Sequence, residues 1–402
     1  MIHSPLARLA LQLGLGALAL LGGCARKNAA PPPQTTIDTL PGSVVRVRNA
    51  GPTAPDDWEI IPDLVIPDST AGPDGLDNPT MLAVDRAGRL YVSDHVVKVF
   101  AADGRFLTII GRDGEGPGEY RAAFIATADR QLIVQDPVLA RLTVYDPSGR
   151  YLRSWSTICC APAPPAADDH GRILVLAPAP VDTLVEHRYL RFRLDGTALD
   201  TLTLPPDREN RLWRLKTGFG SWSTRIPFAP RRQVAAHPAG GLLHIWPSEY
   251  SLIWTMNGRD TVLLFGRDWT PSPVPLARRK AAAGAVTSFV TRNRRNLGGV
   301  ESAELASQIR LEDVPATAPA VVGLTMDWNG QTWAEVDPGL DTLHSHYEVF
   351  DSAGVYLGPV TAPAVFRGRG GTVWTDSSIF ALQETADGEP IVRRYRIRRS
   401  PP

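Results

Sequence analysis

The 402-residue chain has few of the residues on which several classes of protein depend. It contains three cysteines and only four lysines, and its 42 basic residues are balanced by 42 acidic ones. Proteins that bind nucleic acids usually carry a basic excess, and Schiff-base catalysis needs a lysine in a special environment. The charge balance therefore argues against nucleic acid as a partner, and the scarcity of lysine argues against lysine-based covalent chemistry.

Several catalytic signatures are also missing from the sequence. There is no Gly-x-Ser-x-Gly, His-Glu-x-x-His or Cys-x-x-Cys pattern, so the usual serine-hydrolase, zinc-protease and paired-thiol motifs are excluded. The glycine-rich stretch at 111–118 lacks the Gly-Lys-Ser/Thr ending of a phosphate loop, and its acidic residues would repel phosphate. We expect its glycines to allow a tight connection at positive φ instead.

The N-terminal segment has the pattern of an export signal. Arg8 precedes an apolar run at 9–21, which is too short to span a bilayer permanently. The following Leu-Gly-Gly-Cys24 resembles the bacterial lipobox. The resemblance implies a lipoprotein signal peptide over 1–23, a lipidated Cys24 that anchors the chain in a membrane, and a flexible Pro/Ala-rich tether over 24–41. By analogy with known lipoprotein sorting, Ala25 after the cysteine would favour the outer membrane, facing the periplasm or the cell surface, in a cell that has one. The alternative is a secreted protein with a chance cysteine.

The other two cysteines, Cys159 and Cys160, are adjacent. An exported compartment permits disulfides, so a strained vicinal disulfide is one interpretation. Two buried thiols are the other main one, and redox or metal chemistry is a minor third.

Two strand patterns recur along the chain at a spacing of about 41 residues. The first begins at a turn residue, runs through β-branched or aromatic residues and often ends in Asp; its copies are at 88–94, 130–136, 171–177, 241–247, 330–337 and 371–376. The second is a hairpin signature with an Asp/Ser-rich turn and Gly, as in 98–107, 143–152 and 348–357. Units of four strands repeated at this spacing predict the blades of a propeller.

Six copies predict an all-β, six-bladed β-propeller over residues 42–400. The expected blades are 78–121, 122–164, 165–205, 227–268, 316–363 and 364–400. One of the strand-like segments at 43–48 and 58–61 should pair with the last blade and close the ring, because closure removes exposed sheet edges. Residues 276–313 are rich in Ala, Leu, Arg and Glu and predict two short helices inserted between blades four and five, with Phe289, Val290, Leu305 and Ile309 on their apolar side.

The segment Ile110-Gly-Arg-Asp-Gly-Glu-Gly-Pro-Gly-Glu-Tyr120, together with the repeats, resembles the bacterial six-bladed β-propeller proteins of the NHL-repeat type. The resemblance covers about residues 42–400. It implies the fold more firmly than a function, since many such proteins are exported lipoproteins of unassigned activity. RNA binding, known for some NHL-type propellers, is disfavoured here by the export signal and the charge balance.

Two sets of residues are candidates for a metal site. Asp94, Asp136, Asp337 and Asp376 recur at the end of the first pattern, where they either cap turns or form a ring of carboxylates at one mouth of the channel. His344 and His346 lie with Glu348 at alternate positions, and on a strand these side chains would share one face. Calcium or zinc are the ions that such ligands would hold.

A ligand or partner site is predicted in the long connection after the third blade. Trp213, Phe219, Trp222 and Arg225 lie there, and an exposed loop of aromatic residues and arginine suits a sugar, a peptide or a protein. The alternative is a loop folded across the ring.

These observations lead to one functional prediction and its rivals. We expect a non-catalytic binding platform in the bacterial cell envelope for a protein, peptide or glycan. The alternative is a metal-dependent hydrolase, lactonase or lyase with its site on the propeller axis. A purely structural envelope component is the third hypothesis.

Overall fold

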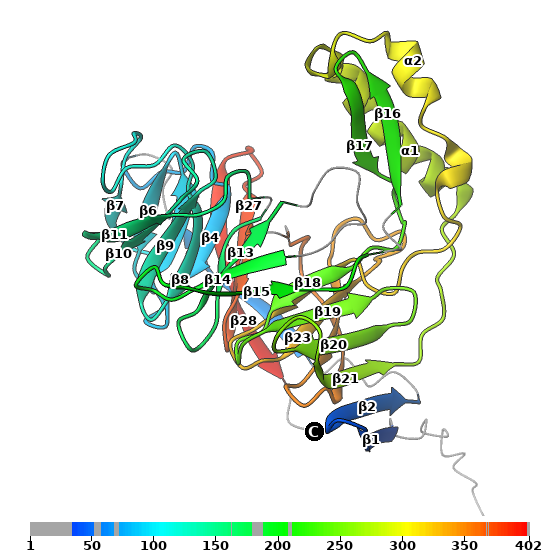
Figure 1. Ribbon diagram of the computed structural model, residues 1–402, viewed down its shortest axis with the longest axis horizontal. Coiled ribbons are helices and arrows are strands. Elements are labelled where there is room, and N and C mark those ends of the chain that lie inside the picture. Colours follow the sequence, from blue (N-terminus) through cyan, green and yellow to red (C-terminus); the bar gives the residue numbers. More distant parts are fainter. Residues whose placement is uncertain are drawn as a thin grey trace, which may run out of the picture.

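Six antiparallel sheets surround a central axis in the computed structural model, which describes residues 34–51, 58–67, 72–161, 163–178, 188–207, 211–366, 368 and 370–399 (Figure 1). The protein is a six-bladed β-propeller, as the repeats predict. In each blade we call the strands A to D from the axis outward. The turns between strands A and B lie at one end of the ring, which we call the AB end.

The first three blades follow the chain in order. Blade 1 contains β4 (Met81–Val84), β5 (Leu90–Asp94), β6 (Val96–Phe100) and β7 (Phe106–Ile110). Blade 2 contains β8 (Phe124–Ala128), β9 (Gln131–Asp136), β10 (Arg141–Tyr145) and β11 (Tyr151–Ser156). Blade 3 contains β12 (Ala166–Ala167), β13 (Ile173–Ala177), β14 (Arg188–Phe192) and β15 (Ala198–Thr203).

Blades 4 and 5 have the same order of strands. Blade 4 contains β18 (Gln233–Ala236), β19 (Leu242–Trp246), β20 (Ser251–Thr255) and β21 (Thr261–Arg267). Blade 5 contains β22 (Gly323–Met326), β23 (Thr332–Val336), β24 (His346–Phe350) and β25 (Tyr356–Thr361).

Blade 6 is completed by the N-terminal part of the chain. It contains β26 (Thr372–Trp374), β27 (Ser378–Glu384), β28 (Pro390–Arg399) and, as its outermost strand, β3 (Trp58–Ile66). β3 pairs antiparallel with β28 from Trp58↔Arg399 to Ile66↔Val392. The prediction that an N-terminal strand closes the last blade is confirmed.

The other N-terminal segment extends blade 4 instead. β2 (Val44–Ala50) runs parallel to β21, and β1 (Gln34–Leu40) pairs with β2 at the edge of that sheet. The predicted tether over 24–41 is therefore wrong for residues 34–40, which form a strand because their partner β2 is already held against blade 4. Its earlier part, including Cys24, and the whole signal peptide at 1–23 lie outside the described residues.

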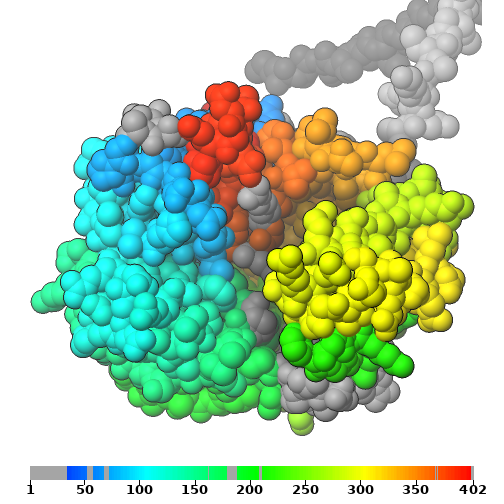
Figure 2. Space-filling model, turned by 90° about the horizontal axis from the view of Figure 1, so that it is seen from above, coloured from blue at the N-terminus to red at the C-terminus, as the bar shows by residue number. Residues whose placement is uncertain are grey.

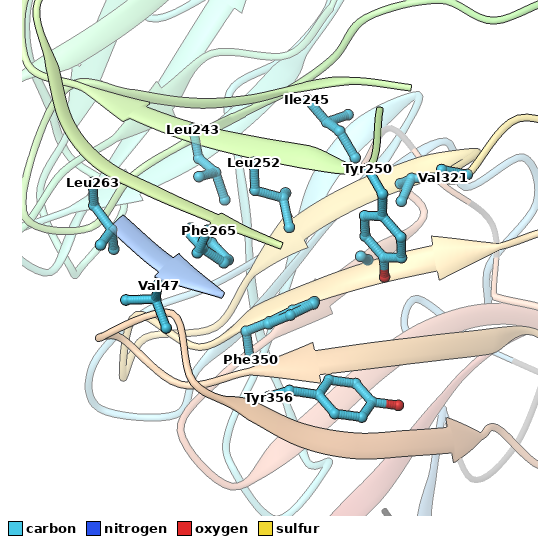
Figure 3. Packing of buried hydrophobic residues seen from close by; sticks show 12 residues of the cluster. Val47, Leu243, Ile245, Tyr250, Leu252, Leu263, Phe265, Val321, Phe350 and Tyr356 are labelled. Carbon is cyan, nitrogen blue, oxygen red and sulfur yellow. The ribbon is translucent and has the colours of Figure 1, made fainter. Parts of the chain in front are cut away.

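The core consists of layers between neighbouring blades. Between blades 4 and 5, strands β19 to β21 pack against β24 and β25, and Val47 of β2 joins this layer (Figure 3). Within it, the rings of Phe265 and Phe350 lie edge to face at 5.3 Å. Both faces of a blade are covered by its neighbours, which explains why the B strands read as continuous apolar runs rather than as alternating ones.

The helical insertion is present and packs on a hairpin to form a small separate layer. The helical elements are α1 (Leu276–Arg292), η1 (Arg294–Leu297), α2 (Ser302–Ser307) and η2 (Leu311–Asp313). They cover β16 (Leu212–Thr217) and β17 (Gly220–Arg225), and the shared core includes Trp213, Val290 and Leu305. We call this unit the cap; it stands over one side of the ring, at the end opposite the AB end (Figures 1 and 2).

Among the described residues, no helix is both long enough and apolar enough to cross a bilayer.

Candidate functional site

The candidate site is a cavity of about 990 Å³ on the axis of the ring. Its lining includes residues of the innermost strand of all six blades, which is why it must lie on the axis. Small residues on these strands, such as Ala128, Ala166, Ala235 and Gly323, leave the space open. This volume is at the upper end of the range typical of pockets that enclose small ligands.

Glu335 is one of several acidic residues that line this cavity. Glu335 of β23 is opposite Gly323 of β22 in the strand register, and a Cβ atom at position 323 would lie 2.4 Å from Glu335 Oε2. The glycine therefore creates the niche that holds the carboxyl group. Ser345 Oγ donates to Glu335 Oε1 at 3.2 Å and accepts the backbone N–H of Phe366 at 3.1 Å, which fixes the position of the carboxyl group.

Burial raises the pKa of Glu335, against the opposing effect of the Ser345 hydrogen bond. The carboxyl group consequently keeps its proton to a higher pH than an exposed glutamate does. A protonated carboxyl group donates one hydrogen bond and still accepts others, so it matches the hydroxyl or amide groups of a polar ligand.

Four aromatic rings form the wall around Glu335. Trp333, Tyr347, Phe366 and Trp374 all line the cavity, and Trp374 lies 4.4 Å from Trp333 and 5.1 Å from Tyr347 between ring centroids. All four residues are buried, so each ring is packed against neighbouring side chains. Aromatic rings beside a few fixed polar groups are typical of sites that orient a small ligand.

The AB end of the cavity is crossed by one arginine. Arg86, in the AB turn of blade 1, places Nη2 at 2.5 Å from Asp169 Oδ1 in the corresponding turn of blade 3. Its guanidinium carbon also lies 4.5 Å from the ring centroid of Trp328 in blade 5. Because blades 1, 3 and 5 alternate around the ring, this side chain spans the mouth of the cavity.

The opposite mouth, below the cap, is rich in arginine. Arg225 of β17, Arg231 and Arg232 line it together with Asp207. The backbone N–H of Arg232 donates to Asp207 Oδ2 at 2.9 Å, and its guanidinium carbon lies 4.1 Å from the ring centroid of Trp246. The cap thus contributes directly to the cavity through Arg225.

The predicted ring of carboxylates is not formed. Asp94, at the end of β5, accepts the backbone N–H groups of Asp77 and Asn78 and lies 3.0 Å from Lys98 Nζ. These contacts lower the pKa of Asp94, although burial alone would raise it. The oxygen atoms of its carboxylate are therefore bound to groups of the turn and to Lys98, and they do not point to a shared cation site.

Asp136 has the same role in blade 2. It accepts the backbone N–H groups of Arg121 (2.6 Å), Val138 (2.9 Å) and Leu139 (3.0 Å). Asp337 in blade 5 instead accepts two hydrogen bonds from Arg278 of α1. Arg278 Nη1 donates to Asp337 Oδ2 and Nη2 donates to Oδ1, each at 2.6 Å. Three of the four aspartates are therefore turn or cap anchors.

Asp376 is at the other end of the molecule, so the prediction that the four aspartates share one position is wrong. It follows β26, which is the innermost strand of blade 6, whereas the other three lie at the ends of B strands. Its carbonyl oxygen accepts Asn329 Nδ2 in the AB turn of blade 5, and its negative charge adds to the burial that raises the pKa of Asp327.

The histidine set is also rearranged. His344 Nδ1 and His346 Nε2 each lie 2.9 Å from Asp341 Oδ2 in the preceding loop. Only His346 is in β24, so the two histidines do not share a strand face. Glu348 points away to blade 4, where it bonds Tyr250 Oη and lies 3.2 Å from Arg267 Nη1. Within the described parts of the chain, no group of three or more His, Cys, Asp or Glu side chains has an arrangement that could hold a metal ion.

Cys159 and Cys160 lie in an exposed turn, with their sulfur atoms 3.0 Å apart. The interpretation of two buried thiols is therefore wrong. Cys160 has a positive φ of 61°, and its N–H donates to the carbonyl oxygen of Pro137 at 3.0 Å.

The predicted partner loop is the β16–β17 hairpin of the cap. Trp213 is buried, and its Nε1 donates to Asp313 Oδ2 at 2.9 Å, so it belongs to the core of the cap. Trp222 stacks on Phe289 at 6.2 Å between centroids. Phe219 remains 82% exposed at the turn, and Arg225 faces the cavity.

Glu335, Gly323 and Arg86 were not predicted as site residues. Glu335 did leave a signal, because the fifth copy of the first pattern places an acid where copies one and two have Ser93 and Gln135. Gly323 and Arg86 left no signal, since their roles depend on residues of other strands and other blades.

Comparison with known proteins supports the fold. A family model described as a 6-bladed beta-propeller matches residues 80–162, which contain blades 1 and 2. No curated protein matches the chain.

Several solved structures are similar in outline. A putative exported protein from Bacteroides fragilis is 10% identical, with 89% of this chain and 100% of that chain covered at a TM-score of 0.48. A member of the DUF4221 family from Bacteroides vulgatus is 10% identical, with 85% and 99% covered at 0.45. An aldose sugar dehydrogenase from Streptomyces coelicolor, in a form with bound PQQ, is 13% identical, with 86% and 99% covered at 0.43.

Proposed function

We propose that this protein is a ligand-binding propeller whose axial cavity holds a short glycan or a peptide of similar size, without a catalytic step. The observation that carries the proposal is the niche of Glu335 in the cavity wall, opened by Gly323 and surrounded by four aromatic rings. A carboxyl group that Ser345 holds in place, and whose pKa is raised by burial, suits the hydroxyl or amide groups of such a ligand, because it accepts their hydrogen bonds and donates one when it is protonated.

Arginines at both mouths support the same proposal. Arg86 crosses the AB end, and Arg225 reaches the other end from the cap. Both side chains are long and have several rotatable bonds. Each can therefore change its rotamer to admit a ligand without any change in the backbone of the blades. The cap would then act on ligand entry through Arg225.

The experiment is calorimetric titration of the chain from residue 25 onward with panels of oligosaccharides and of short peptides. The test variant is Gly323→Ala, because its methyl group would displace the Glu335 carboxyl group. Position 323 has no positive φ and the displaced group is the flexible end of a side chain, so the variant should fold. We expect it to lose at least about tenfold in affinity, or ~1.4 kcal/mol, for a ligand that the wild type binds.

Gly284→Ala in α1 is the matched control, since a Cβ there meets nothing within 4 Å. Equal affinity of wild type and Gly323→Ala for every ligand found would overturn the proposal. Turnover of a bound glycan or peptide would instead overturn its non-catalytic part.

We also propose that the protein is a lipoprotein of the cell envelope, anchored through Cys24. This proposal depends on the lipobox-like sequence, which lies outside the described residues. Incorporation of labelled palmitate into the wild type but not into Cys24→Ala, in a bacterial host, is the expected result. Equal labelling of both would contradict it.

A further inference from the structure

We propose that the distal tip of the cap binds the surface of an anionic phospholipid bilayer. The tip consists of the hairpin turn at 218–220 and the segment at 289–299 beside it, and α2 (Ser302–Ser307) lies at the same end of the cap (Figure 1). Gly218 and Gly298 hold these parts together, because Gly218 N–H donates to Leu297 O at 3.0 Å and a Cβ on Gly218 would lie 2.4 Å from Gly298 O. The two parts of the tip are therefore in direct contact.

The charge of the cap is the first observation. Residues 211–225 and 276–300 contain ten basic residues and no acidic one. The whole cap, with 301–313 included, has eleven basic and four acidic residues in a chain of zero net charge. The excess is thus a local property of the cap, and it fits a negatively charged partner.

Four basic side chains within the tip or next to it are available to such a partner. Lys216, Arg292 and Arg295 are exposed and Arg294 is half-buried. Within the described parts of the chain, none of these four forms an ion pair. By contrast, Arg278 at the base of α1 is engaged by Asp337 of blade 5.

Exposed aromatic rings lie among these charges. Phe219 is 82% exposed at the turn, and Phe289 is 49% exposed where it stacks on Trp222. The cap protrudes from the ring (Figure 1), and its outer surface is rounded where the helical insertion covers it (Figure 2). A protruding apolar ring surrounded by cations suits the flat interface of a bilayer, where the ring enters the headgroup region and the cations meet lipid phosphates.

The test is co-sedimentation of the chain from residue 25 onward with lipid vesicles, because this chain lacks Cys24 and any lipid attached to it. Vesicles of phosphatidylcholine alone are compared with vesicles that also contain phosphatidylglycerol. We expect about tenfold stronger binding to the anionic vesicles, and most of that binding should disappear in about 0.5 M salt, where exposed charges are screened.

Two variants separate the contributions. Phe219→Ser and the triple variant Arg292→Glu, Arg294→Glu, Arg295→Glu should each weaken binding to anionic vesicles at least about fivefold. Ile37→Ser, which removes an exposed apolar residue of β1, and the triple variant Arg48→Glu, Arg105→Glu, Arg398→Glu, which reverses exposed charges outside the cap, are the matched controls. The controls should bind like the wild type.

Three results would overturn the proposal. They are no preference for anionic vesicles, equal losses in the tip and control variants, and binding to a soluble polyanion such as dextran sulfate in place of vesicles. The last would assign the tip to an anionic polymer. None of these outcomes depends on the axial cavity, so this test and the titration of the proposed glycan or peptide site are independent.

Discussion

Gly323 and Glu335 show how two residues acquire a role only when strand pairing brings them together. Each is unremarkable in the sequence, yet the register between β22 and β23 places the glycine opposite the acid. The sequence predicted the strand that carries Glu335 but not the niche, because a niche depends on the neighbouring strand. The recurring aspartates do not form the predicted metal site for a related reason. A residue that recurs at the same position in several blades more often stabilises a turn that all these blades share.

The raised pKa of Glu335 leads to a prediction about stability. Its folded-state pKa lies above the ordinary value of about 4.3, so the native state binds more protons than the unfolded state between these two values. The free energy of unfolding should therefore fall as the pH rises through this window. Glu335→Gln removes the titrating group, and we expect its urea-unfolding free energy to fall less than that of the wild type between pH 4 and pH 7.

Glu389→Gln, at an exposed turn, is the control for that measurement. It should show the same dependence on pH as the wild type. A Glu335→Gln variant that follows the wild-type curve would show that burial of this carboxyl group does not perturb its ionisation.

The adjacent cysteines give a second prediction at this scale. Both are exposed and their sulfur atoms lie 3.0 Å apart, so an external disulfide such as oxidised glutathione should convert them to a vicinal disulfide and release two reduced glutathione molecules. Intact-mass measurement of the chain from residue 25 onward should show the loss of two hydrogens with no glutathione retained. Cys160→Ser should instead keep a mixed disulfide on Cys159. Two cysteines that remain fully open to alkylation after oxidation would contradict the prediction.

At the scale of elements, the repeats predicted all six blades and misplaced one of their strands. The stretch at 371–376 resembles the B strands of the earlier copies but forms the A strand of blade 6. Among the described residues, three strands follow residue 371, and β3 fills the outermost position, so these three strands occupy the inner positions. The spacing of the repeats along the chain could not predict this shift, because the fourth strand of blade 6 comes from the N-terminal part of the sequence.

The cap hairpin was missed in a different way. Residues 212–217 alternate between apolar and basic side chains, as a half-buried strand does, but they fall outside the period of the blades. The alternation has its explanation in the cap, where Trp213 and Leu215 face the helices and Arg214 and Lys216 face outward.

The contact between the cap and blade 5 provides the prediction at this scale. Arg278 donates twice to Asp337 and lies 4.7 Å from the ring centroid of Phe228. The pair is largely shielded from solvent, with 23% and 9% of the two side chains exposed, so a coupling of about 1–3 kcal/mol is expected. Arg278→Ala should make the connections of the cap more sensitive to limited proteolysis and leave the blades resistant.

A double-mutant cycle with Asp337→Ala measures this coupling through unfolding free energies. Arg292→Ala, at the distal end of the same helix, is the control and should not alter the cleavage pattern. A coupling indistinguishable from zero would mean that the apolar core of the cap, not this ion pair, fixes its position.

At the scale of the whole molecule, the ring depends on a contact between the two ends of the chain. β28 has β3 as its outer neighbour, and Arg394 and Arg396 of β28 both bind Asp63 of β3. Ile66 at the end of β3 is completely buried and joins the layer between blades 6 and 1. The axial cavity needs all six inner strands, so closure of the ring is also a condition for the proposed binding site.

Truncation tests this dependence. A chain that begins at residue 68 lacks β3, and its blade 6 would expose the edge of β28, a template for pairing with another chain. We expect this chain to self-associate in size-exclusion chromatography with light scattering and to lose the single cooperative melting transition. A chain that begins at residue 52 lacks only β1 and β2, and with them the bonds of Asn49 to Gly354 O and Tyr356 N–H, but it keeps β3. It should remain a closed monomer with a lower melting temperature, whereas equal behaviour of the two chains would show that β3 is not the strand on which closure depends.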